Sequence, residues 1–133
     1  MGTWGLGSFE NDDAADWVYE LETVEDLSVC RNTFLSVMTE DEYLQQDQGA
    51  QVIAAAEVIA TLAGSPRHNL PEGVASWLTT HPLSPDADDH TLALSAIERV
   101  LAPNSELRAL WAEVGDGLWE SEIDDLRQRL SRD

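Results

Sequence analysis

Residues 52–63 read VIAAAEVIATLA, a stretch that is apolar at every position except Glu57 and one threonine. Good helix formers such as Ala and Leu fill it, and neither Gly nor Pro interrupts it. Because apolar residues surround the helix axis instead of forming one stripe, such a helix is expected to be buried on all sides. We therefore predict a central helix from about Asp47 to Ala63, ended by Gly64 and Pro66.

Amphipathic patterns lie on both sides of this segment. Apolar residues recur there at three- and four-residue intervals, which is the period of one helix face, whereas the alternation typical of strands is absent at any useful length. A chain of 133 residues suits one domain. The sequence thus predicts an all-α fold, one compact multi-helix domain of about six or seven helices over residues 1–133. The expected buried stripes are Ala14, Trp17, Val18 and Leu21; Leu27, Cys30, Phe34 and Val37; Val74, Trp77 and Leu78; Leu94, Ile97 and Leu101; Leu107, Leu110, Trp111 and Val114; and Trp119, Ile123, Leu126 and Leu130.

The first segment of the chain combines glycines with large apolar residues. Three glycines within the first seven residues are interleaved with Trp4 and Leu6 and followed by Phe9. Glycine permits backbone conformations and close approaches that a side chain forbids. We therefore expect this Gly/Trp-rich N-terminal loop to pack over the central helix near Glu57. Asn11 then makes a good N-cap for the first helix.

The charge balance restricts the classes of partner. The chain has 26 acidic residues and 7 basic ones, all arginine, for a net charge of -19. Nucleic acids and anionic lipids demand clusters of basic residues, so neither is an expected partner. A basic protein or a cation is electrostatically suitable. The alternative is that the acidity only keeps the surface solvated.

Cysteine content and hydropathy bear on the compartment. The single cysteine, Cys30, falls at an apolar position of a helical pattern, which predicts a buried free thiol in a reducing compartment. The N-terminus lacks the basic and apolar regions of a signal peptide. The longest apolar stretch is too short to span a bilayer and contains Glu57. We therefore expect a cytoplasmic protein that does not enter the membrane.

Glu57 is the most informative single residue, because a carboxylate on a buried helix needs compensation. One reading makes it a structural carboxylate that joins two elements, with Arg31, Arg67, Arg99, a Trp N–H or the amides of the glycine loop as donors, or else a carboxylate that reaches solvent. The other reading makes it a general base or a metal ligand. The structural reading is favoured, since no second catalytic partner is identifiable nearby in the sequence.

Asp12 and Asp16 are the other catalytic candidates, because their i, i+4 spacing places two carboxylates on one helix face. No acidic cluster has the spacing of a calcium loop, and the histidines are isolated, so neither a dedicated metal site nor a cofactor is predicted. Acids in a first helical turn also have a structural reason to be there. The residues predicted to bind a partner or ligand are Trp4, Phe9, Asn11, Asp12, Asp16 and Glu57.

Three blocks of the sequence carry a resemblance to a known family. They are MGTWGLGSFENDDAADW at residues 1–17, AAAE at residues 54–57, and NSELR at residues 104–108 with Trp111. Together they resemble a bacterial family catalogued as domain of unknown function 4259. The resemblance covers nearly the whole chain and implies a small, stand-alone bacterial cytoplasmic protein. It implies no activity.

These observations favour a non-enzymatic interaction or regulatory protein. A more specific version is an inhibitor or immunity-type protein that masks a basic partner, for which acidity would speed association. The competing hypothesis is a hydrolase or transferase whose site combines Glu57 with Asp12 or Asp16, with or without a divalent metal. A third is a structural subunit of a homo-oligomer.

Overall fold

The computed structural model describes residues 12–38, 43–64, 70, 72–115 and 117–131. Within these ranges the chain forms helices and a single isolated bridge of extended backbone between Leu44 and Ser105, which confirms the all-α prediction. No helix in the described ranges combines the length and the apolar character needed to cross a membrane. The helices are α1 (Asp12–Leu21), α2 (Ser28–Met38), α3 (Gln46–Leu62), α4 (Glu72–Thr80), α5 (Ala87–Val100), α6 (Glu106–Val114) and α7 (Leu118–Ser131).

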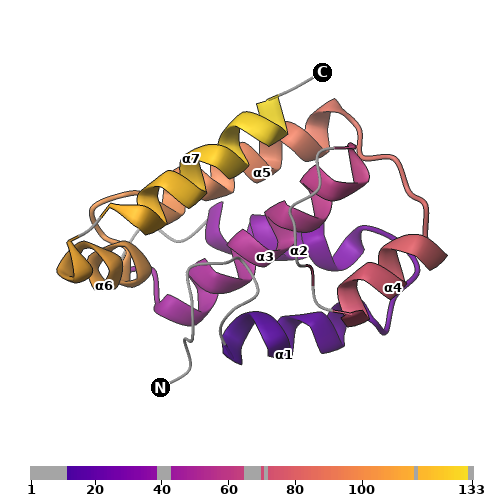
Figure 1. The fold of residues 1–133 in the computed structure, drawn as a ribbon, viewed down its shortest axis with the longest axis horizontal. Helices are drawn as coiled ribbons and strands as arrows, with labels where there is room; N and C mark the ends of the chain where they lie inside the picture. Colours follow the sequence, from indigo (N-terminus) through magenta and orange to yellow (C-terminus); the bar gives the residue numbers. More distant parts are fainter. Residues whose placement is uncertain (1–11, 39–42, 65–69, 71, 116, 132–133) are drawn as a thin grey trace.

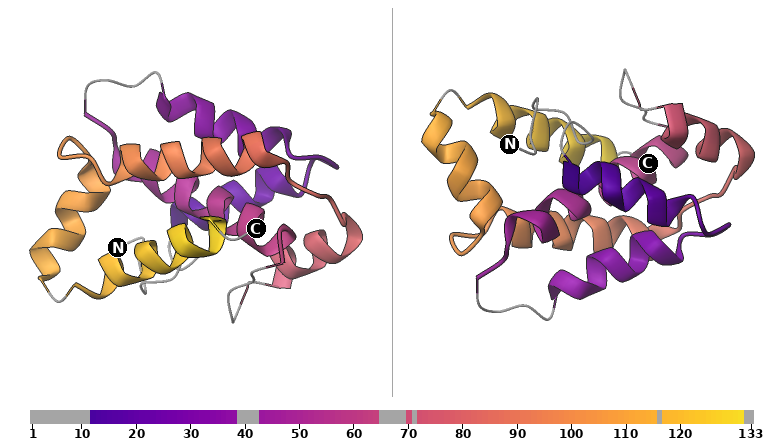
Figure 2. Two further views of the ribbon diagram at one scale, coloured as in Figure 1. Left: turned by 90° about the horizontal axis from the view of Figure 1, so that it is seen from above. Right: turned by 90° about the horizontal axis from the view of Figure 1, so that it is seen from below.

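Helix α3 is the centre of the molecule, as the sequence predicts, and its observed bounds differ from the predicted ones by one residue at each end. Helices α5 and α7 cover one side of it and α1 the opposite side (Figure 1). Helices α4 and α6 lie at the two ends of the molecule (Figure 2). Every residue from Val52 to Ala60 is buried, because α3 has neighbours all round.

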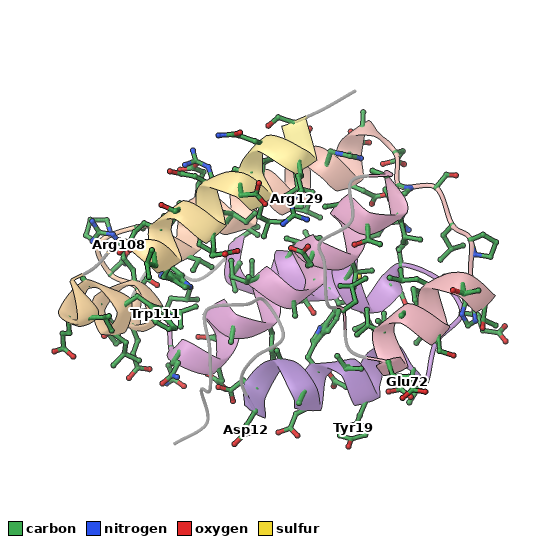
Figure 3. The ribbon with its side chains drawn as sticks, in the orientation of Figure 1. Asp12, Tyr19, Glu72, Arg108, Trp111 and Arg129 are labelled. Carbon is green, nitrogen blue, oxygen red and sulfur yellow. The ribbon has the colours of Figure 1, made fainter. Side chains whose placement is uncertain are left out.

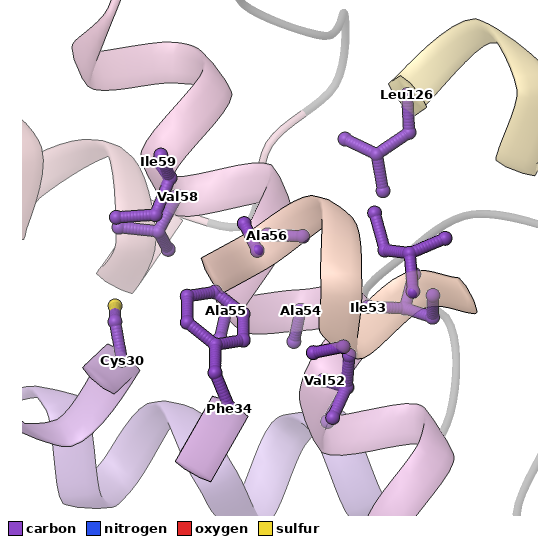
Figure 4. Close-up of a cluster of buried hydrophobic side chains, with 14 of the residues drawn as sticks. Cys30, Phe34, Val52, Ile53, Ala54, Ala55, Ala56, Val58, Ile59 and Leu126 are labelled. Carbon is purple, nitrogen blue, oxygen red and sulfur yellow. The ribbon is translucent and has the colours of Figure 1, made fainter. Parts of the chain in front are cut away.

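The packing around α3 combines small residues on the central helix with larger ones on its neighbours. Phe34 and Cys30 of α2 point toward α3, and Leu126 of α7 approaches it from another direction (Figure 4). Alanines 54–56 of α3 are completely buried, which allows neighbouring helices to come close. The stripes predicted for α1, α2 and α7 are buried throughout.

The buried face of helix α5 is not the one that the sequence predicts. Ile97 is buried as predicted, but Leu94 and Leu101 are only partly buried at the edge of the core. The buried face is formed by Ile97 with Val100 and two alanines, Ala93 and Ala96. Small residues allow α5 to pack closely against both α2 and α3, and this close approach outweighs the larger apolar area of the leucines.

Helix α6 is the clearest departure from the predicted stripes. Only Leu107 of its four apolar stripe residues is buried, whereas Leu110 and Val114 remain exposed and Trp111 is half-buried. The ring of Trp111 stacks on that of Trp119, with centroids 6.2 Å apart and an interplanar angle of 5°. The prediction that the N-terminal loop from Trp4 to Phe9 packs on the central helix concerns residues outside the described ranges, and so does the predicted N-cap at Asn11.

Candidate functional site

The carboxylate of Glu57 lies in the core, between α3 and α7, and is completely buried. Arg129 of α7 donates to both of its oxygens: Nη1 lies 2.5 Å from Oε1, and Nη2 lies 3.0 Å from Oε2. This two-pronged geometry is the strong form of an arginine–carboxylate pair, since it combines charge attraction with two parallel hydrogen bonds. The pair therefore satisfies the carboxylate that the sequence marks as needing compensation.

The guanidinium of Arg129 has a second carboxylate partner. Its Nε donates to Oδ2 of Asp125, one helical turn earlier on α7, at 2.8 Å. Burial opposes the positive charge of Arg129, but the hydrogen bonds and charges of Glu57 and Asp125 outweigh it and hold the pKa above its ordinary value. The buried group is thus an arginine between two carboxylates, one in the core and one at the surface.

Arg129 was not among the donors predicted for Glu57. Arg31 pairs instead with Asp89, at 2.6 and 3.0 Å, and Arg99 donates to Asn104, while position 67 lies outside the described residues. The sequence alone indicates no partner for Arg129. Its position three residues after Leu126, and so on the same buried face of α7, could have indicated that this arginine is buried.

This geometry determines what Glu57 can do chemically. A general base needs a lone pair within hydrogen-bond reach of the proton that it takes, and a metal ligand needs a lone pair directed at the ion. Both oxygens of Glu57 face the Arg129 guanidinium, and the side chain has no exposed surface. The arrangement therefore supports the structural reading, in which the carboxylate joins α3 to α7.

Asp12 and Asp16 lie elsewhere. Both are exposed on α1, and Figure 3 shows Asp12 on the outer side of that helix, across α3 from Arg129. The structure does not bring them together with Glu57. With Glu20 they occupy positions i, i+4 and i+8 of one helix face, and we call these three exposed residues the α1 acidic ridge. Tyr19, 70% exposed, stands beside it.

The acids at the start of α1 repel one another. Partial burial, followed by the charges of Asp47, Asp16 and Asp12, raises the pKa of the Asp13 carboxyl above its ordinary value. Helix α1 itself carries no basic residue that would offset them. Within the described ranges no group of three or more His, Cys, Asp or Glu side chains is arranged to hold a metal ion.

The remaining nucleophile and histidine candidates have structural surroundings. Burial, followed by the charge of Asp89, raises the pKa of the Cys30 thiol to about 12, so the thiol is protonated and enclosed. The Nδ1 of His81 lies 2.9 Å from the carbonyl oxygen of Trp77, and that of His90 lies 2.8 Å from the carbonyl oxygen of Leu130. Each of these histidine rings is thus engaged with the backbone.

Comparison with known families adds one finding. A family model described as "Domain of unknown function (DUF4259)" matches residues 2–122. The chain belongs to this family. The resemblance found in the sequence is thereby confirmed, and it carries no activity with it. Glu57 and the α1 acidic ridge lie inside the matched range, whereas Asp125 and Arg129 follow it. No curated protein and no solved structure matched the chain.

Proposed function

We propose that this member of the DUF4259 family is a non-enzymatic interaction protein that binds a basic protein partner through the α1 acidic ridge. The observation that carries the proposal is the ridge itself: three exposed carboxylates on one helix face with no basic residue on that helix. Like charges at i, i+4 destabilise a helix by a few tenths of a kcal/mol per pair, about 0.2–0.5. A cationic partner surface relieves that repulsion on binding.

The distribution of the arginines supports the same proposal. Arg31, Arg127 and Arg129 are engaged in ion pairs with acids of the chain, among them Asp89, Glu98 and Glu57. Arginines in such pairs neutralise their own partner carboxylates and leave the other surface carboxylates without a compensating positive charge. With a net charge of -19, the remaining surface attracts cationic proteins over a distance and accelerates their association. Masking a basic surface, as an inhibitor or immunity-type protein does, is the specific form of this function.

The enclosed Glu57 weighs against the competing hydrolase or transferase hypothesis. A site built on Glu57 with Asp12 or Asp16 requires these carboxylates to converge, whereas Glu57 is in the core and the other two are on the outer surface of α1. The ridge, by contrast, needs no rearrangement to meet a partner. In this proposal the exposed α1 acidic ridge binds the partner, and the buried Glu57 contributes to stability.

Affinity capture from a native lysate of the source organism tests this proposal. The immobilised chain is compared with a ridge variant, Asp12→Asn/Asp16→Asn/Glu20→Gln. A matched control, Glu25→Gln/Asp88→Asn/Glu113→Gln, neutralises three other exposed acids. A stoichiometric basic protein is expected on the wild type and on the control at low salt, and it is expected to be lost with the ridge variant. Failure to recover such a protein, or equal recovery by all three chains, would overturn the proposal.

A further inference from the structure

Three helix ends surround an open groove of about 680 Å³. They are the C-terminal ends of α3 and α7 and the N-terminal end of α5, which lie close together in Figure 1. Each helix contributes a leucine to the apolar part of the groove: Leu62 of α3, Leu94 of α5 and Leu130 of α7. Asp86 and His90 are the titratable side chains among the described residues that line it, and none of those residues is Lys or Arg. A concave surface of this size is typical of ligand sites.

The ring of His90 is held in one tautomer. Its Nδ1 lies 2.8 Å from the carbonyl oxygen of Leu130 at the end of α7, and a carbonyl oxygen can only accept, so Nδ1 carries the hydrogen. In the neutral ring the other nitrogen, Nε2, is therefore an acceptor. Within the described ranges the ring makes no further hydrogen bond. The groove thus contains a positioned acceptor that can receive an N–H group from a ligand.

The partial charges around the groove are mainly negative. Carbonyl groups at a helix C-terminus lack intrahelical donors and give that end about half a negative charge, and both α3 and α7 end here. The start of α5 contributes an opposite partial charge, which its own carboxylates offset, since Oδ1 of Asp86 accepts from the backbone N–H of Asp89 at 2.9 Å. Arg31, whose charge acts on Asp86, is bound by Asp89 and does not line the groove. The groove therefore attracts positive charge.

We propose that this groove binds a small organic cation, a primary ammonium group on an alkyl chain. An ammonium group has three N–H donors and no acceptor, which matches a site whose polar groups accept. The acceptors are Nε2 of His90 and Oδ2 of Asp86, which makes no hydrogen bond within the described ranges, together with carbonyl groups at the helix ends. The alkyl chain covers the leucines of the groove. An anion would instead be repelled by Asp86 and by the ends of α3 and α7. This proposal does not depend on the α1 acidic ridge.

Titration of the full chain with three matched probes, followed by amide NMR spectra, tests the site. The probes n-pentylammonium, n-pentanol and pentanoate share an alkyl chain and differ in charge. Pentylammonium is expected to shift the signals of residues 87–94 and 130–131 in a saturable way, with a dissociation constant on the order of 1 mM. Pentanol is expected to bind at least about tenfold more weakly, and pentanoate not at all. Equal affinities for the three probes, shifts that do not saturate, or shifts centred on the α1 acidic ridge would overturn the proposal.

Two substitutions test the polar contacts of the ammonium group. His90→Phe keeps a ring but removes Nε2, and Asp86→Asn removes the charge but keeps a good N-cap. Each is expected to weaken pentylammonium binding about fivefold or more. The controls are His81→Phe, which removes another histidine whose Nδ1 lies against a backbone carbonyl, and Asp88→Asn, which neutralises another acid of the first turn of α5. Neither control residue lines the groove, so binding within about twofold of the wild type is expected. Four variants with equal affinities would overturn the proposal.

A direct contact measurement keeps the proposal testable if His90→Phe does not fold. In the wild-type chain, nuclear Overhauser effects are expected between the terminal methyl group of pentylammonium and the methyl groups of Leu62, Leu94 and Leu130. Asp86→Asn is expected to reduce them, because less of the probe is bound at the same concentration. The absence of these effects at a saturating probe concentration would contradict binding in this groove.

Discussion

Arg129 and Glu57, which lie 72 residues apart in the sequence, form a two-pronged ion pair inside the core. The pair links the central helix α3 to the last helix α7 and has Asp125 as an outer partner. A charge in the core is tolerated only when an opposite charge and good hydrogen-bond geometry accompany it. We therefore expect the pair to help fix how α7 sits on α3, in addition to the apolar contacts between the two helices.

Removing the arginine is expected to destabilise the protein strongly. Arg129→Met leaves the Glu57 carboxylate buried without its principal cation, and the expected loss is about 3–5 kcal/mol in the free energy of unfolding. Chemical denaturation followed by circular dichroism measures it. As a control, Arg127→Met removes an arginine of the same helix whose ion pairs are exposed, and a loss within about 1 kcal/mol is expected.

Changing both members of the pair distinguishes two causes of the destabilisation by Arg129→Met, the uncompensated buried charge of Glu57 and the loss of packing. In Glu57→Leu/Arg129→Met both charges are absent, so the double variant is expected to recover most of the stability that Arg129→Met loses. Such recovery would identify the uncompensated carboxylate as the cause. A double variant no more stable than Arg129→Met would contradict this account of the pair.

The thiol of Cys30 is expected to be inert in the folded protein. With its pKa raised to about 12 by burial and by Asp89, the reactive thiolate is scarce at neutral pH, and the side chain is enclosed. Alkylation by iodoacetamide, followed by mass spectrometry, is expected to be negligible in native buffer and complete in denaturant. Rapid modification of the native protein would contradict the assigned burial.

The Arg31–Asp89 pair is expected to make stability depend on acidity. Hydrogen bonding from Arg31, opposed by burial and aided by the backbone N–H of Asp86, lowers the pKa of Asp89. The unfolded chain then takes up a proton before the folded one does. The stabilisation is full above the unfolded carboxyl pKa of about 3.9 and is lost as the pH falls through the lower folded value.

Urea titrations at several pH values check this dependence. The gap in unfolding free energy between wild type and Asp89→Asn is expected to be constant from about pH 6 to 8 and to narrow below about pH 4. Arg31→Gln removes the partner instead of the carboxylate and is expected to show the same narrowing. A gap that widens on acidification would contradict the assigned direction of the pKa shift.

The parts of the fold that depend on local pattern could be predicted from the sequence. Helical periodicity, which depends only on residues close in the sequence, predicts two of these features. They are the apolar character of α3 all round its axis and the buried stripe of α7, formed by Trp119, Ile123, Leu126 and Leu130. The face of α5 could not be predicted in this way. Its alanines are buried because α2 and α3 both approach it closely, which is a property of the assembled packing.

Of the buried ion pair, Glu57 could be predicted from the sequence, whereas its partner Arg129 could not. A glutamate among alanines and valines predicts a buried carboxylate that requires a hydrogen-bonding or charged partner, so Glu57 could be identified from the sequence. The identity of that partner depends on how α7 crosses α3, and nothing within a local window of sequence relates residue 57 to residue 129. Asp12 and Asp16 were correctly placed on one helix face, but spacing alone does not show how far that face lies from Glu57.

The α1 acidic ridge is proposed to recognise a basic protein. The association rate constant of the captured partner, measured by surface plasmon resonance over a range of salt concentrations, tests it most directly. At low salt the ridge variant is expected to associate about tenfold or more slowly than the wild type and to lose most of the salt dependence. The control with three other acids neutralised is expected to retain both. Equal rates and equal salt dependence for the ridge variant and the control would contradict the claim.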